Sequence, residues 1–276
     1  MTSYKNIKVS VVEQYPSILL VQIDRAHKRN AVNRETADEL YQVFKERFEN
    51  DKQLSVAILT SSDSTSSFCA GADLEIISAG KVDEMNRLEE NSDRGPMGVT
   101  RLFLSKPVIA AVSEGYCVAG GLELALWCDL RICTENSIFG VFCRRFGVPL
   151  IDGGTIRLPR LIGQSRALDL ILTGRPVGSS EALQIGLVNR VVKSAKELLP
   201  TAIELARLIS TFPQECMRSD RRSLYEQHHM NIDQAIKNEF QLGYKSLMNE
   251  GKVGSNLFIK DRIGRHGKQP IIDSKL

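Results

Sequence analysis

The chain has 276 residues, of which 42% are apolar and 25% are charged, and it contains 20 Gly and 9 Pro. This composition is typical of a globular protein with a substantial core and excludes disordered, collagen-like and coiled-coil chains. The formal net charge of +3, from 36 Lys and Arg against 33 Asp and Glu, is too small to indicate a nucleic-acid or anionic-membrane partner.

Taken in chain order, the first part of the sequence alternates between strand and helix signals. Residues 7–24 alternate in polarity and predict a hairpin that turns at residues 15–17. Asn33 precedes a stretch whose apolar residues recur every three or four positions up to Phe48, which predicts an amphipathic helix with an asparagine cap. A compact apolar run at 55–62 predicts a buried strand.

The remaining elements continue this α/β pattern and then become helical. We expect, in order, a helix with a Gly-interrupted surface loop over 75–103, a strand–helix–strand unit over 106–141, helices over 164–172 and 179–185, a strand over 187–192 and helices over 194–250. The sequence therefore predicts an α/β core over residues 1–195 and a helical region over residues 196–276.

The cysteines and histidines favour neither disulfides nor a metal site. The six cysteines contain no C-x-x-C pair and lie mostly in apolar runs, so we expect buried thiols in a reducing compartment. The four histidines have no spacing that could form a zinc site. The first residues resemble neither a signal nor a transit peptide, and no apolar run reaches the roughly 18 residues of a membrane span. We expect a soluble, non-secreted protein without a metal.

Two segments of small residues are candidates for chemistry at the backbone. They are residues 68–74, FCAGADL, and residues 115–124, GYCVAGGLEL, and each follows a strand-like run. The second segment opens a helix, whose first amides have no internal partner. If one amide from each segment faced the same point, the two would stabilise a carbonyl oxygen that becomes an enolate. Alternatively, these glycines only permit close packing of helix and strand.

Four stretches carry a family resemblance: FCAGADL, KPVIAAVSEGYCVAGGLELALWCDLRI, FGVFCRRFGVPLIDGGTIRLPRLIG and LILTGRPVGSSEALQIGLVNRVV. In order and spacing, over about residues 6–260, they resemble the crotonase superfamily, the enoyl-CoA hydratase/isomerase family. The resemblance implies a spiral of ββα units followed by helices that assemble a homotrimer or a hexamer. It also implies an acyl-CoA substrate, with coenzyme A as part of the substrate and no separate cofactor. In this family two backbone amides hold the thioester oxygen, and by position they match Ala72 and Gly120.

Glu123 matches the first catalytic glutamate of the hydratases. It lies in the first turn of the expected helix, where the helix dipole favours its carboxylate, whereas the surrounding leucines favour a raised pKa. The second hydratase glutamate is absent, because Cys143 occupies that position three residues after Gly140. A thiol with an ordinary pKa of about 8.5 is a poor acid or base at neutral pH, so we interpret Cys143 as a packing residue.

Asp152 is the candidate for the second proton-transfer group. It lies in a Gly-rich turn next to the expected acyl pocket, and the alternative is that it only caps this turn through an Asx hydrogen bond. Arg144 and Arg145 come earlier in the same segment. They could pair with Asp152 or with a carboxylate of the substrate, or else form ordinary solvated ion pairs.

The remaining site candidates are implied by the family resemblance. Lys28 and Arg29, in the turn after the hairpin, are candidates for contacts with the phosphates of coenzyme A. Ala70, Asp73 and Leu74, in the FCAGADL segment, are candidates for lining the pantetheine groove. Phe258 and Lys260, near the C-terminus, are candidates for a coenzyme A contact across a subunit boundary. Exposed basic turns and basic tails also occur without any ligand.

The last three residues, Ser274, Lys275 and Leu276, form the S-K-L tripeptide that the peroxisomal import receptor reads at a free C-terminus. The sequence therefore predicts a peroxisomal acyl-CoA enzyme, with hydration of an enoyl-CoA as the first choice. Double-bond isomerisation with a single carboxylate and a catalytically silent acyl-CoA-binding homologue are the alternatives.

Overall fold

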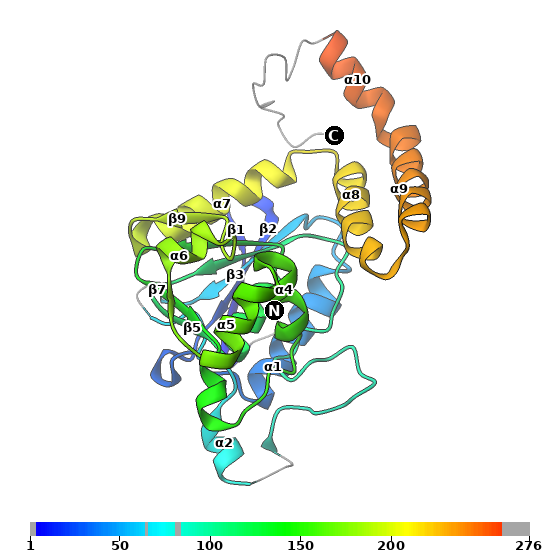
Figure 1. Ribbon diagram of the computed structural model, residues 1–276. Helices are drawn as coiled ribbons and strands as arrows, with labels where there is room; N and C mark the ends of the chain where they lie inside the picture. Colours follow the sequence, from blue (N-terminus) through cyan, green and yellow to red (C-terminus); the bar gives the residue numbers. More distant parts are fainter. Residues whose placement is uncertain (1–3, 64–65, 81–83, 261–276) are drawn as a thin grey trace. The chain divides into compact units, whose positions relative to one another are not determined.

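The computed structural model describes residues 4–63, 66–80 and 84–260 (Figure 1). Contacts divide the chain into two compact units, Met1–Ala206 and Arg207–Leu276, and each is described by itself. Within the described ranges every helix is too short or too polar to cross a lipid bilayer.

The first unit is built on a six-stranded sheet. All of its neighbouring strands are parallel except the first pair, which forms the predicted antiparallel hairpin. Strands β3 and β4 are buried on both faces, which explains why they are uninterrupted apolar runs in the sequence. The order across the sheet is β1 (Ile7–Val12), β2 (Tyr15–Ile23), β3 (Val56–Ser61), β4 (Val108–Val112), β6 (Leu130–Thr134) and β9 (Arg190–Val192).

A second sheet of three short strands lies in the same unit: β5 (Gly115–Val118), β7 (Ser137–Gly140) and β8 (Val177–Gly178). Strand β4 leads directly into β5, and β6 leads directly into β7, so each pair of consecutive strands is divided between the two sheets. Helix α3 (Gly120–Trp127) follows the first pair. This order of two strands and a helix is the ββα arrangement that the family resemblance implies.

The other helices of the first unit surround these sheets. Asn33 caps the first long helix as predicted, because its side chain accepts a hydrogen bond from the amide of Thr36. The helices and helical turns are η1 (Ala26–Lys28), α1 (Arg34–Tyr41) with its π-helical continuation η2 (Gln42–Phe48), α2 (Leu74–Ser78), η4 (Phe142–Phe146), α4 (Gly154–Ile162), α5 (Gln164–Thr173) and α6 (Ser179–Gln184).

Three local predictions were wrong. The hairpin turns at residues 13–14, since Val12 pairs with Tyr15, and Pro16 lies near the start of the strand, where a missing amide is tolerated. The region 84–103 contains no described α-helix, and residues 95–100 are buried rather than part of the expected surface loop. Its turns contact other elements, as Arg94 does by binding Asp38 of α1. Helix α4 was not predicted, because Gly154 and Pro159 are residue types that usually disfavour a helix.

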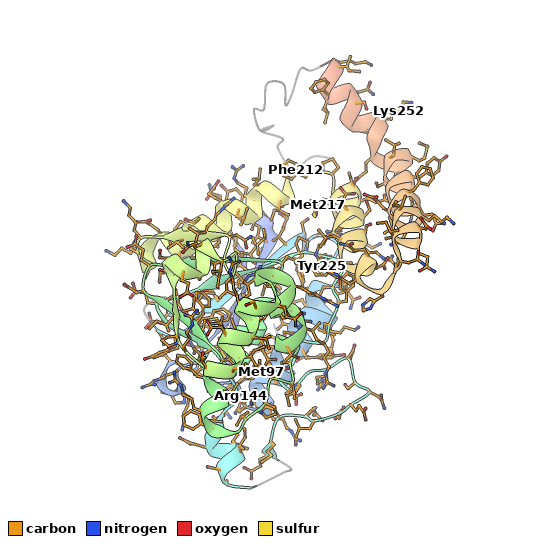
Figure 2. All side chains as sticks on the ribbon, viewed as in Figure 1. Met97, Arg144, Phe212, Met217, Tyr225 and Lys252 are labelled. Atoms are coloured by element: carbon orange, nitrogen blue, oxygen red, sulfur yellow. The ribbon has the colours of Figure 1, made fainter. Side chains whose placement is uncertain are left out.

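The second unit is helical, as predicted. The sequence placed the boundary after residue 195, whereas the units divide within α7 (Ala195–Ser210), whose N-terminal half carries residues buried in the first unit, such as Leu198 and Ala202. The helices that follow are α8 (Gln214–Glu226), η5 (Gln227–His229), α9 (Ile232–Ser246), η6 (Leu247–Gly251) and α10 (Lys252–Ile259). Figure 2 labels Phe212, Met217, Tyr225 and Lys252 of this unit.

Candidate active site

The two glycine-bearing segments found in the sequence contact each other through their backbones. The amide of Cys69 donates to the carbonyl of Tyr116 at 3.2 Å, and the amide of Val118 donates to the carbonyl of Cys69 at 3.1 Å. Gly71 has a φ of +99°, and a Cβ added there would lie 3.0 Å from the nitrogen of Gly120. Glycine is required at this position both by the left-handed backbone and by the close approach.

Ala72 presents a free amide on the first segment. The residues on either side of it pair with Val32, because Gly71 accepts from the Val32 amide at 2.8 Å and Asp73 donates to the Val32 carbonyl at 3.1 Å. Since amides along an extended segment alternate in direction, the N–H of Ala72 points away from Val32. Across the described ranges, this amide has no protein hydrogen-bond partner.

Gly120 presents the second free amide. It is the first residue of α3, where the helix cannot satisfy the N–H, and no other described residue accepts its hydrogen bond. The residue before it, Ala119, has a φ of 54° and a ψ of −129°, a strained conformation that persists only where the surroundings enforce it. The packing interpretation of the glycine pair applies to Gly121, because a Cβ there would lie 2.0 Å from the carbonyl oxygen of Cys69.

Glu123 lies one helical turn beyond Gly120 and is 2% exposed. Its Oε1 accepts hydrogen bonds from the amides of Asp152, at 2.9 Å, and Gly154, at 2.8 Å. Oε2 has no hydrogen-bond partner among the described residues. Burial, and then repulsion by Asp152, raise the pKa of Glu123 to about 7 despite the two amides. A carboxyl with this pKa is suited to proton transfer at neutral pH.

Asp152 is buried, 4% exposed, and lies beside Glu123 rather than in a solvated turn. Its Oδ1 accepts hydrogen bonds from the amide of Met97, at 2.9 Å, and from the hydroxyl of Thr100, so its side chain does not form the Asx turn that was the alternative. Burial raises the pKa of Asp152, while the Thr100 hydroxyl and the Met97 amide act in the opposite direction. The site thus contains two neighbouring buried carboxyls.

Both carboxyls, both free amides and Cys143 line one cavity of about 340 Å³. Most of the other lining side chains are apolar, and some of them are exposed at the surface, such as Leu88 and Phe146. Burial and the nearby Glu123 raise the pKa of the Cys143 thiol, which therefore remains protonated at neutral pH. Among the described residues, no cluster of three or more His, Cys, Asp or Glu side chains is placed to hold a metal ion.

The two arginines predicted as partners of Asp152 bind backbone carbonyls instead. Arg144 donates to the carbonyl of Ile171 at 3.2 Å and Arg145 donates to the carbonyl of Gly174 at 2.8 Å. Neither arginine lines the cavity, so the predicted pairing of either with Asp152 is not formed.

The predicted coenzyme A contacts fall into two groups. Ala70, Asp73 and Leu74 line the cavity. Lys28 forms an ion pair with Glu75, and Arg29 lies over the ring of Tyr116, 5.8 Å from its centroid. The roles of these residues in binding stay predictions.

The C-terminal candidates belong to the second unit or lie beyond the described residues. Phe258 is in α10 and is 52% exposed, and Lys260 follows the end of that helix. Ser274, Lys275 and Leu276 lie outside the described residues, so peroxisomal import stays a prediction.

Sequence reasoning missed the segment that supports Asp152. Met97 and Thr100 donate hydrogen bonds to Asp152, and a Cβ added to Gly120 would lie 2.7 Å from the Met97 sulfur. The available signal was Gly95, where a Cβ would lie 2.1 Å from the Thr100 Oγ1 and 2.8 Å from the Asp152 Oδ1. A third glycine-bearing segment therefore approaches the site.

Comparisons with known proteins agree with this geometry. The family model described as enoyl-CoA hydratase/isomerase matches residues 13–263. Mevalonyl-coenzyme A hydratase sidH of Aspergillus fumigatus is 34% identical over 238 residues, which cover 84% of this chain and 84% of that protein. Carnitinyl-CoA dehydratase of Escherichia coli is 40% identical over 202 residues, which cover 71% and 73%.

A solved structure extends the likeness to nearly the whole chain. The crystal structure of enoyl-CoA hydratase EchA1 from Mycobacterium marinum matches with a TM-score of 0.83 at 30% identity, and the match covers 96% of this chain and 97% of that one. This agreement confirms the predicted α/β fold with its C-terminal helices.

Proposed function

The chain belongs to the enoyl-CoA hydratase/isomerase family, and we propose that this enzyme catalyses the reversible addition of water to an α,β-unsaturated acyl-CoA. The single observation that carries the proposal is the cavity that combines the free amides of Ala72 and Gly120 with the carboxyls of Glu123 and Asp152. The hydratase and dehydratase names of its relatives support the same reaction type.

The two amides stabilise the negative charge that develops on the thioester oxygen during hydration. When the oxygen of water bonds to Cβ, the electrons of the double bond move through Cα to the thioester oxygen and form an enolate. The N–H groups of Ala72 and Gly120 stabilise this oxygen, and losing one such donor typically costs on the order of 3 kcal/mol of transition-state stabilisation. Collapse of the enolate then requires a proton at Cα.

The two carboxyls account for the two proton transfers. Because both are buried and adjacent, ionising both is unfavourable, and the pair holds one proton over a range of pH. The ionised member accepts the proton of water, and the protonated member supplies the proton to Cα. Each carboxyl uses one oxygen for its backbone or hydroxyl partners, so that the other oxygen is available to the reactants.

The presence of a cysteine at position 143, in place of the second hydratase glutamate, favours double-bond isomerisation as a second candidate function. Its protonated thiol lines the cavity where the hydratases have their second glutamate, and moving a proton between Cα and Cγ needs only one carboxylate. In that reaction Glu123 removes and returns the proton, and no oxygen is added.

The two reactions are separated by supplying 2-enoyl-CoA and 3-enoyl-CoA thioesters of several chain lengths in D₂O. Hydration consumes a 2-enoyl-CoA and produces a 3-hydroxyacyl-CoA with one deuteron at Cα, which nuclear magnetic resonance detects. Isomerisation converts a 3-enoyl-CoA into the conjugated isomer without a hydroxyl product. Absence of turnover with every thioester would instead support the silent acyl-CoA-binding homologue.

We expect that replacing Cys143 with alanine changes kcat/KM for hydration by less than about threefold. The thiol stays protonated beside Glu123, and the Glu123–Asp152 pair performs both proton transfers in our proposal. Steady-state kinetics with the preferred 2-enoyl-CoA measures the effect. A loss of about 10²-fold would mean that the thiol takes part in proton transfer and that the roles of the pair are misassigned.

We also propose that this enzyme assembles as a homotrimer or as a hexamer through its helical C-terminal unit. Helix α9 carries an apolar stripe with a spacing of four residues, and each side chain in it is more than half exposed in the single chain: Ile232, Ile236, Phe240 and Tyr244. An apolar stripe of this kind is typical of a surface that another protein covers.

Replacing Phe240 with aspartate should dissociate the assembly, because a charge at the centre of the stripe would be buried without a partner. Analytical ultracentrifugation measures the mass of the particle in solution, and Gln241→Asp on the same helix is the matched control. A monomeric native protein, or an assembly unchanged by Phe240→Asp, would rule out this interface.

A further inference from the structure

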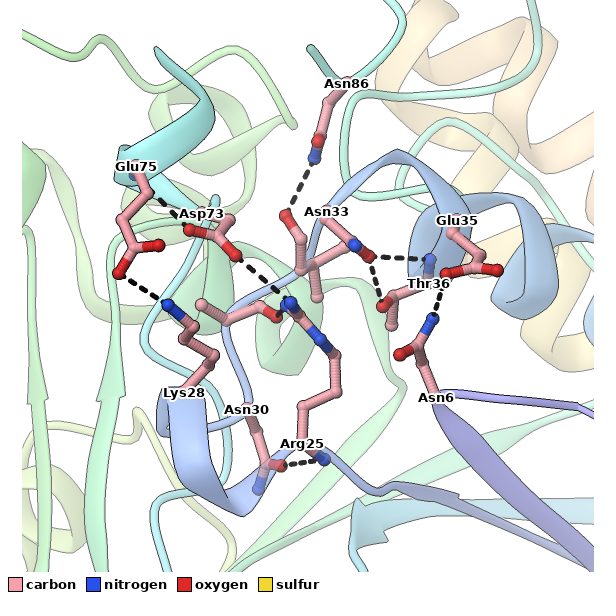
Figure 3. A network of polar contacts seen from close by, with 12 residues as sticks. Asn6, Arg25, Lys28, Asn30, Asn33, Glu35, Thr36, Asp73, Glu75 and Asn86 are labelled. Carbon is pink, nitrogen blue, oxygen red and sulfur yellow. Dashed lines mark hydrogen bonds and ion pairs between the residues drawn. The ribbon is translucent and has the colours of Figure 1, made fainter. Parts of the chain in front are cut away.

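A buried ion pair between Arg25 and Asp73 joins the turn that follows β2 to the segment that carries Ala72. The guanidinium of Arg25 contacts a carboxylate oxygen of Asp73 at 3.1 Å, and the two side chains are only 9% and 8% exposed (Figure 3). Arg25 also donates to the carbonyl of Ala31, and its own amide donates to the side chain of Asn30 at 2.8 Å. A buried pair of this kind requires such additional hydrogen bonds to offset the cost of removing both charges from water.

The ion pair lies next to the hydrogen bonds that orient the Ala72 amide. Asp73 is the residue after Ala72, and Ala31 is the residue before Val32, whose backbone pairs with Gly71 and Asp73. Arg25 therefore connects a neighbour of each bridge partner, Ala31 on one segment and Asp73 on the other. The direction of the Ala72 N–H depends on the bridge, because the alternation of amides is fixed only while Val32 stays paired.

A second set of contacts holds the same bridge from the cavity side. The side-chain amide of Asn86 donates to the carbonyl of Val32 at 3.1 Å and to the carbonyl of Pro96 at 2.9 Å. Pro96 precedes Met97, whose amide binds Asp152. The bridge is thus held between the ion pair and the segment that supports the carboxyls.

We propose that Arg25 and Asp73 are positioning residues that aim the Ala72 amide at the thioester oxygen, an inference that rests on the proposed acyl-CoA chemistry of this cavity. The carboxylate of Asp73 accepts hydrogen bonds from the guanidinium of Arg25 and from the amide of Glu75, the latter at 3.3 Å. Although Asp73 lines the cavity, its side chain acts through the backbone of Ala72 rather than on the substrate.

The test uses a double variant, Arg25→Met with Asp73→Asn. Removing only one partner leaves a buried charge unpaired and can prevent folding, whereas the double variant removes both charges and leaves an acceptor for the amide of Glu75. We expect kcat to fall by up to about 10²-fold, while KM changes by less than about threefold. The control is Arg175→Met with Asp169→Asn and Glu181→Gln, which removes the charges of an ion network outside the cavity and should leave both constants unchanged.

An infrared measurement tests the inference without relying on turnover. A saturated acyl-CoA with a ¹³C-labelled thioester carbonyl is bound to each variant, and the amides of the native protein should lower the carbonyl stretching frequency by polarising the bond. The double variant should still bind the ligand but lose part of this shift. Native-like kcat and carbonyl frequency in the folded double variant would overturn the inference. A native shift without turnover of any thioester would instead refute the proposed function alone.

Discussion

Replacing Glu123 with glutamine should lower kcat by about 10²- to 10⁴-fold and leave the affinity for coenzyme A thioesters nearly unchanged. The amide of the glutamine can no longer take or supply a proton near neutral pH. Its oxygen can still accept the amides of Asp152 and Gly154, as Oε1 of the glutamate does, so the cavity should keep its shape. Steady-state kinetics and calorimetric titration with a saturated acyl-CoA measure the two effects.

The same substitution should make the protein more stable at alkaline pH. Glu123 has a pKa of about 7 in the folded protein and an ordinary value of 4.5. The folded state therefore retains a proton that the unfolded state releases, and the free energy of unfolding falls as the pH rises from 4.5 to about 7. The glutamine variant escapes this loss, which is at most about 3 kcal/mol. Urea unfolding at pH 5 and pH 8 measures the difference.

If the variant loses activity but is no more stable than the native protein at pH 8, the raised pKa of the buried Glu123 is wrong. A variant that retains native kcat would contradict its catalytic role. The two measurements are independent, because stability is read without substrate.

The residues alone indicated the two small-residue segments and the helix start, and the family resemblance assigned Ala72, Gly120 and Glu123 to one site. Gly71 and Gly121 are needed where two backbones touch, and a helix that begins at Gly120 must expose its first amides. The strands and the cap at Asn33 follow from apolar spacing and from one side-chain hydrogen bond. The cap and the apolar spacing are short-range features that a single sequence contains, whereas the contact between the two glycine-bearing segments joins residues far apart in the chain.

The parts that were missed depend on pairs of residues that are far apart in the chain. Residues 84–103 appeared helical because their polar side chains suit a helix, yet Arg87 and Arg94 bind Asp38 of another element. The Arg25–Asp73 pair joins positions 48 residues apart, and nothing in either local segment indicates it. The buried Asp152 carboxylate likewise accepts a hydrogen bond from Thr100, which is far away in the chain. The sequence around Asp152 therefore could not distinguish a solvated loop carboxylate from a buried partner of Glu123.

Replacing Asp152 with asparagine should lower kcat by about 10²-fold or more, because the pair loses one of its two proton-transfer groups. The side-chain oxygen of the asparagine can still accept from the amide of Met97 and the hydroxyl of Thr100, so the segment that carries them should stay in place. Loss of the negative charge should also lower the pKa of Glu123, since repulsion by Asp152 contributes to its rise.

The pH dependence of kcat/KM separates this account of Asp152 from a structural one. In the native enzyme one limb of the profile should report Glu123 near pH 7, and in Asp152→Asn that limb should move to lower pH because the neighbouring negative charge is gone. A purely structural role would lower activity at every pH and leave the limb where it was. Asp129→Asn is the matched control, because Asp129 also accepts a backbone amide, that of Val108 at 2.8 Å, but lines no part of the cavity. If Asp152→Asn hydrates enoyl-CoA at the native rate, Glu123 performs both proton transfers of hydration alone, and the role proposed for Asp152 is wrong.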